Sequence, residues 1–134
     1  MTVNIKIVTL ISFIALLSGN SHAENYEKSV INHRLILKGA ESSGIEFIGS
    51  DKVVMYAEIT GDMPIVEARV KWIGNNFFYM VENGRNCTEC PPRSWLYKIE
   101  SIKNNEVSML EFNNTWPAFK DEVSVYTLRM NKNK

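Results

Sequence analysis

The sequence contains few of the residues on which enzymes and metal sites usually depend. Only two cysteines and two histidines occur in 134 residues, and one of the two histidines, His22, lies in the N-terminal segment. General-base catalysis near neutral pH uses histidine most often, and structural zinc needs about four Cys, His or carboxylate ligands. The Gly-x-Ser-x-Gly nucleophile motif and the glycine-rich phosphate loop are also absent. We therefore expect a protein that is not an enzyme and that binds no metal or cofactor.

The sequence also lacks an excess of charge of one sign. Without Lys6 of the N-terminal segment, 15 − 1 = 14 basic residues stand against 15 acidic ones, a net charge of 14 − 15 = −1. The two signs are scattered along the chain. Because nucleic-acid-binding proteins usually present a basic stripe, we expect no nucleic-acid partner.

No apolar run is long enough for a membrane-spanning helix, which needs about 20 residues. The longest run, 7–17, follows Lys6 and is broken by Ser18-Gly19-Asn20 before the small residue Ala23. This order predicts a signal peptide over residues 1–23, cleaved after Ala23; the alternative is a retained membrane anchor. Residues 24–134 are then one domain, periplasmic or secreted, and not membrane-anchored after cleavage.

Apolar and charged side chains alternate along most of the domain, with the period of two that is typical of half-buried strands. Residues 64–73 show this most clearly, and 24–32 carry only a weak helical signal. Glycine and asparagine clusters divide the rest into eight predicted strands. These are 33–38, 44–48, 52–59, 64–72, 76–82, 94–102, 106–112 and 122–130. Their short connections predict an all-β fold, an eight-stranded antiparallel up-and-down barrel; the alternative is a two-sheet β-sandwich.

The predicted connections differ in length at the two ends of the barrel. Those at 49–51, 73–75 and 103–105 are short and share one end. Those at 39–43, 60–63, 83–93 and 113–121 share the other end. Since binding residues concentrate on loops held by a rigid scaffold and pockets favour barrel mouths, the loop-rich end is the candidate site.

The strand pattern resembles that of small bacterial lipocalin-like proteins of the calycin type. The matching pieces are 35–39, 45–48, 53–56, 70–78, 95–99, 107–110 and 125–128. Gly39 is followed by Ala40 and Glu41 where lipocalins have Gly-x-Trp. The resemblance implies an eight-stranded barrel that holds a small apolar ligand.

Cys87 and Cys90 form a C-x-x-C pair followed by Pro91 and Pro92. In an oxidising compartment a disulfide is the default for such a pair, and we expect it to stiffen the 83–93 loop. The alternative is a thiol-disulfide oxidoreductase that uses Cys87 and Cys90. That chemistry favours a cysteine at a helix N-terminus, whereas this pair lies between two predicted strands.

We expect a non-catalytic exported binding domain whose ligand or partner meets the loop-rich end. Arg93 is a candidate anion-binding residue; the alternative is a solvated arginine beside Glu82 or Glu89. The candidate ligand- or partner-binding residues are Arg93, Trp95, Trp116, Phe119, Trp72 and Tyr97.

Two versions of this function remain open. In the first, the barrel holds a small apolar molecule, lined by Phe47, Tyr56, Val70, Trp72, Tyr79, Trp95 and Tyr97. In the second, the protein's own side chains fill the core, as in many small barrels. The loops then recognise an envelope protein, as in a periplasmic inhibitor or immunity protein.

Overall fold

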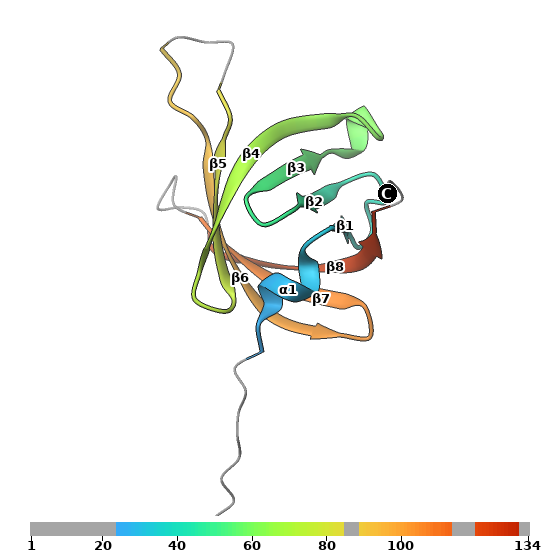
Figure 1. Ribbon diagram of the computed structural model, residues 1–134. Helices are drawn as coiled ribbons and strands as arrows, with labels where there is room; N and C mark the ends of the chain where they lie inside the picture. The colour runs from blue at the N-terminus through green and yellow to red at the C-terminus, as the bar shows by residue number, and fades with distance from the viewer. Residues whose placement is uncertain (1–23, 85–88, 114–119, 132–134) are drawn as a thin grey trace, which may run out of the picture.

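The computed structural model, which describes residues 24–84, 89–113 and 120–131, is a closed antiparallel β-barrel (Figure 1). The strands are β1 (His33–Leu37), β2 (Gly44–Ile48), β3 (Lys52–Tyr56), β4 (Pro64–Ile73), β5 (Phe77–Glu82), β6 (Ser94–Lys103), β7 (Glu106–Phe112) and β8 (Glu122–Met130). A short helix α1 (Tyr26–Val30) precedes β1, and a 3-10 turn η1 (Glu58–Thr60) follows β3. The predicted barrel with its up-and-down strand order is confirmed.

Pairing of β1 with β8 closes the barrel. Their register runs from His33 opposite Met130 to Leu37 opposite Tyr126. Each strand therefore has two hydrogen-bonded neighbours, in the order β1 to β8 and back to β1. Closure removes the open sheet edges that would otherwise expose unpaired backbone groups.

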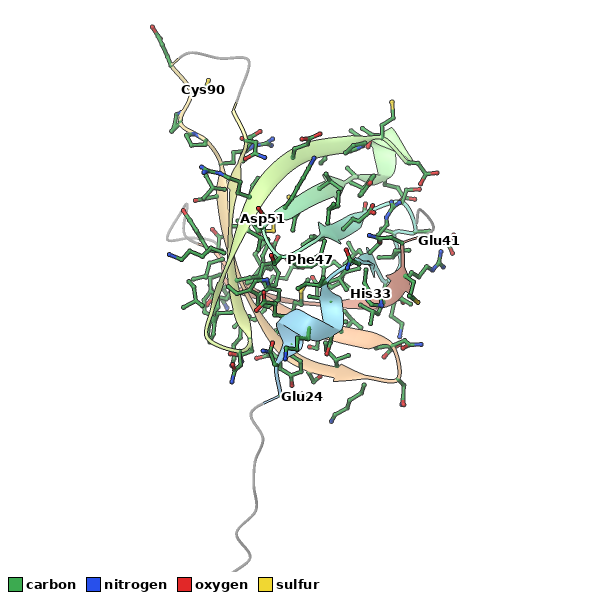
Figure 2. All side chains as sticks on the ribbon, in the orientation of Figure 1. Glu24, His33, Glu41, Phe47, Asp51 and Cys90 are labelled. Atoms are coloured by element: carbon green, nitrogen blue, oxygen red, sulfur yellow. The ribbon has the colours of Figure 1, made fainter. Side chains whose placement is uncertain are left out.

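The interior is packed by alternate residues of the strands. Among the described residues, ten of the larger side chains are less than 2% exposed. They are Phe47, Phe78, Leu35, Ile45, Met80, Ile99, Met109, Val30, Val53 and Val107. Figure 2 shows Phe47 inside the barrel. One of the ten, Val30, comes from α1, so this helix contributes to the core.

Helix α1 covers the end of the barrel that has the short turns. The Tyr26 amide donates to the Asn75 carbonyl in the β4–β5 turn (3.1 Å). Asn25 caps the helix, since its side chain accepts from the Lys28 amide at 3.5 Å. His33 follows the helix, and its Nδ1 lies 2.9 Å from the Ile31 carbonyl oxygen. These contacts fix the N-terminal segment against the short-turn end.

The strand predicted for 52–59 ends three residues early, at Tyr56. The β3–β4 register shifts between Met55 and Tyr56. Beyond this shift the Thr60 hydroxyl lies 3.0 Å from the Ala57 carbonyl and 2.9 Å from the Met63 carbonyl. A side chain that bonds to its own backbone competes with the strand ladder, and a 3-10 turn forms in place of the last strand residues.

The connections have the predicted asymmetry. Three short turns, 49–51, 74–76 and 104–105, join strands at one end. The four connections 38–43, 57–63, 83–93 and 113–121 lie at the other end, which we call the loop-rich rim. Figure 1 shows the β5–β6 hairpin extending well beyond the rest of the barrel.

Gly44 lies where the backbones of β1 and β2 come too close together for a side chain on residue 44. It is buried and lies opposite Ile36, and a Cβ atom at this position would overlap the Leu35 carbonyl oxygen. Because that oxygen belongs to the backbone, it cannot move away without displacing the strand.

We predict that Gly44→Ala lowers the free energy of unfolding by about 1–3 kcal/mol, the usual cost of overpacking a core. Urea denaturation of the wild type and the variant measures the difference. Gly84→Ala is the control, because a Cβ there meets no atom within 4 Å and the cost is limited to its positive φ of 67°. A smaller loss for Gly44→Ala than for Gly84→Ala would contradict the steric argument.

Candidate functional site

Arg93 and Glu82 form a clip at the base of the β5–β6 hairpin. The Arg93 Nε and Nη2 atoms donate to the two carboxylate oxygens of Glu82 at 3.0 and 2.7 Å. The backbone adds two bonds: the Arg93 amide donates to the Glu82 carboxylate (3.1 Å), and the Glu82 amide to the Arg93 carbonyl (2.9 Å). The Glu82 side chain is 9% exposed and that of Arg93 46%. Arg93 is therefore held beside Glu82, as the alternative interpretation expected.

Arg93 of the clip also contacts the indole ring of Trp95. The Arg93 guanidinium carbon lies 5.6 Å from the ring centroid, within the range of a cation–π contact. The hydrogen bond with Glu82 is the main cause of the raised pKa of Arg93. Trp95 itself is half-buried against the core. Of the predicted binding residues, Arg93 and Trp95 thus lie together at the loop-rich rim.

A polar group lies inside the barrel below this clip. The Tyr97 hydroxyl donates to the Glu111 carboxylate at 3.2 Å, and these two residues are opposite each other on β6 and β7. Burial raises the pKa of Tyr126 to about 12, with the nearby Glu111 charge as the second cause. Burial is also the main cause of the raised pKa of Glu111 itself. Glu111 was not predicted as a site residue. Its position two residues after Met109, on the inward side of β7, was the available signal.

Trp72 lies at the other end of the barrel. Its ring centroid is 5.8 Å from that of Phe47 and 5.1 Å from that of Phe78. These contacts place Trp72 in the core beside the short turns, so it does not join Arg93 and Trp95. Its indole nitrogen is buried and has no hydrogen-bond partner among the described residues.

Two tyrosines expected inside the barrel lie on its outer wall. The Tyr56 hydroxyl donates to Glu46 at 2.8 Å, and Tyr79 lines an outer hollow with Arg69 and Lys71. The expectation that Tyr56 and Tyr79 line the interior is therefore wrong. Both lie in strand segments that are apolar at every position, where alternation does not reveal the inward face.

Three predicted residues, Cys87, Trp116 and Phe119, lie outside the described residues. The Cys87–Cys90 disulfide therefore stays a prediction. Figure 2 places Cys90 on the outer part of the β5–β6 hairpin, remote from the barrel interior.

The β3–β4 connection carries an exposed apolar tip that the sequence did not reveal. Ile59 in η1 is 95% exposed, the highest value among the large apolar residues that the structure describes, and Met63 is 68% exposed. We call these two residues the apolar tip.

The loop that carries the apolar tip is held at both sides. The Ser42 amide donates to the Glu58 carboxylate at 3.1 Å, which joins η1 to the β1–β2 loop. Arg34 donates to Asp62 at 3.4 Å and to the Ser42 carbonyl at 3.1 Å. The exposure of Ile59 therefore belongs to a loop with defined contacts.

The Tyr56 ring packs against the Arg34 side chain that contacts this loop. The Arg34 guanidinium carbon lies 3.8 Å from the Tyr56 ring centroid, and the Arg34 side chain is 18% exposed. Burial, followed by the hydrogen bond to Glu46, raises the pKa of Tyr56 to about 12. These residues line an outer hollow of about 400 Å³ next to the β3–β4 loop.

In the part of the chain that is described, no three His, Cys, Asp or Glu side chains are grouped so that they could hold a metal ion. None of the described helices is long and apolar enough to cross a membrane. Comparison of the chain with protein-family models, with curated proteins and with solved structures finds no match.

We predict that Glu111→Gln changes stability in a pH-dependent way. The folded-state pKa of Glu111 is raised, so wild-type folding takes up a proton there and the wild type loses stability as pH rises from its unfolded-state pKa through its folded-state pKa. Glutamine does not titrate. The unfolding free energy of the variant minus that of the wild type should therefore increase between pH 4 and neutral pH.

Chemical denaturation across this pH range measures the difference, with far-ultraviolet circular dichroism as the check that the fold is retained. A difference that stays constant or falls with rising pH would contradict the burial of the Glu111 charge.

Proposed function

We propose that this protein is a non-catalytic binding domain of the cell envelope that recognises a protein partner through its loop-rich rim. The apolar tip, Ile59 and Met63, is the anchor of this contact. The observation that carries the proposal is its high exposure on a loop that Ser42, Arg34 and Thr60 hold in place. Export and the envelope location rest on the predicted signal peptide over 1–23.

Because the loop that carries the apolar tip is already ordered, binding costs less conformational entropy. Association costs conformational entropy when side chains and loops become fixed, and a loop that is already ordered avoids part of this cost. Interface energy is concentrated in a few anchor residues that become fully desolvated on binding, and methionine is among the residues enriched at interfaces. Ile59 and Met63 match this description, since both are exposed in the free protein.

The filled interior supports the partner version of the function over the apolar-ligand version. Side chains that are less than 2% exposed come from α1 and from seven of the eight strands, and they occupy the barrel interior. Toward the rim, Tyr97 and Glu111 add a polar pair rather than an apolar lining. A carrier of small apolar molecules needs an open cavity of a few hundred Å³.

Site-specific photo-crosslinking tests the proposal. A photoreactive amino acid is placed at Ile59, and at Ile48 in a matched control; Ile48 is 42% exposed and borders the short-turn end. The full chain is expressed in the cells that make it and irradiated. We expect a defined protein adduct from position 59 and none from position 48.

The double variant Ile59→Asp/Met63→Asp then quantifies the contact. Its affinity for the crosslinked protein should fall by a factor of 30 or more, in line with about 2 kcal/mol or more for an interface hot spot. Its urea midpoint should stay near that of the wild type, because surface substitutions usually change stability by less than about 0.5 kcal/mol.

Two results would overturn the proposal. One is an adduct from position 48 and none from position 59. The other is native mass spectrometry of the purified protein showing a stoichiometric small apolar molecule, which would assign the first version of the function.

A further inference from the structure

Charged and apolar residues are unevenly distributed over the outer wall of the barrel, although exposed isoleucines occur on β2 and β4 as well. Outward positions of β1, β2 and β4 carry charged residues, for example Arg34, Glu46 and Arg69. Outward positions of β5 to β8 carry a group of apolar residues, with Lys98, Glu100, Glu106 and Arg129 also on these strands. We call the following six residues the outer apolar band: Phe77, Tyr79, Leu96, Leu110, Phe112 and Val123.

The band is continuous across four strands. Tyr79 lies opposite Leu96, Leu96 opposite Phe112, and Leu110 opposite Val123. The rings of Phe77 and Phe112 stack at 6.0 Å between centroids. All six side chains keep some solvent exposure, and Val123 is 54% exposed. Contiguous apolar surface of this kind marks interaction sites, whereas single exposed apolar residues do not.

Positively charged side chains lie beside the outer apolar band and within it. Arg69 and Lys71 lie on the outer face of β4, directly opposite Val81 and Tyr79 on β5, and these four residues line a hollow of about 430 Å³. Neither cation forms an ion pair within the described ranges 24–84, 89–113 and 120–131.

The residues that line the hollow carry more positive than negative charge. Lys98 reaches over the Phe77 ring at 5.9 Å, and its ion pair with Glu100 is long, at 3.8 Å. Asp51 also lines the hollow, so two cations and one carboxylate face it. An anionic ligand group therefore complements the hollow.

We infer that the outer apolar band docks on the surface of an anionic lipid bilayer, with lipid phosphates bound beside Arg69 and Lys71. The wall of a barrel is convex, and a fluid bilayer adapts to a convex apolar surface without a preformed groove. Tyrosine and phenylalanine next to lysine and arginine are suited to a membrane interface, because these residues combine apolar bodies with polar or charged neighbours there.

This docking is reversible and uses the folded barrel, so it differs from anchoring by the N-terminal segment. It also uses a surface separate from the apolar tip. A partner held at the rim and a bilayer held at the wall do not compete for the same residues.

Vesicle sedimentation tests the inference. The folded protein without residues 1–23, the form expected after export, is mixed with vesicles of phosphatidylcholine alone, or of phosphatidylcholine with a minor fraction of phosphatidylglycerol. We expect binding to the vesicles that contain phosphatidylglycerol. High salt should weaken it, because the screening length falls from about 10 Å at 0.1 M to about 3 Å at 1 M.

Matched variants separate the hollow from general charge attraction. Each cation near an anionic membrane strengthens binding about fivefold, so Arg69→Gln/Lys71→Gln should lower the partition coefficient about 25-fold. Lys28→Gln/Arg129→Gln removes the same charge at exposed positions on α1 and β8 and should leave it nearly unchanged. Val123→Gln should weaken binding through the band without loss of stability.

An equal loss in both double variants would overturn the inference, since attraction would then depend on net charge alone. Absence of vesicle binding would also overturn it. Analytical ultracentrifugation then identifies the alternative: a dimer that Val123→Gln disrupts would assign the band to a second copy of this chain.

Discussion

The structure depends on the backbone pairing of β1 with β8. Seven of the eight strand pairs join consecutive strands, whereas this pair joins His33–Leu37 to residues near the end of the described chain. Loop-closure entropy grows only slowly with the length of chain enclosed, so one long-range contact of this kind is affordable once the meander has formed. Without it, both terminal strands would expose unpaired backbone groups.

Closure also determines which residues have a common environment. In a closed cylinder every second side chain points inward, and Phe47, Met80, Ile99 and Met109 from four different strands meet in one core. The same geometry sends successive connections to alternate ends. The asymmetry between short turns and the loop-rich rim therefore follows from the order of loop lengths along the chain, and no loop needs a special contact to produce it.

Much of this could be predicted because alternation and turn chemistry are local signals. The turns form where Gly49, Gly74, Asn104 and Asn105 adopt positive φ, a conformation that these residue types tolerate best. The end of β3 could not be predicted, because it depends on hydrogen bonds of Thr60 that exist only in the folded loop. The exposure of Ile59 follows from the same loop. A hydropathy pattern treats it as one more buried isoleucine.

The errors at Tyr56 and Tyr79 have one physical origin, which also explains the outer apolar band. In Val53-Val54-Met55-Tyr56 and Phe77-Phe78-Tyr79-Met80-Val81 every residue is apolar, so alternation gives no inward face. Strands with two apolar faces are typical of sheets that are covered on both sides. The outward face of β3 is covered by other residues of the same chain. Val54 is 5% exposed, and Tyr56 packs against Arg34. For β5 the outward Phe77 and Tyr79 stay partly exposed. The ambiguity in the sequence of β5 thus reflects an outward face whose apolar side chains stay partly exposed.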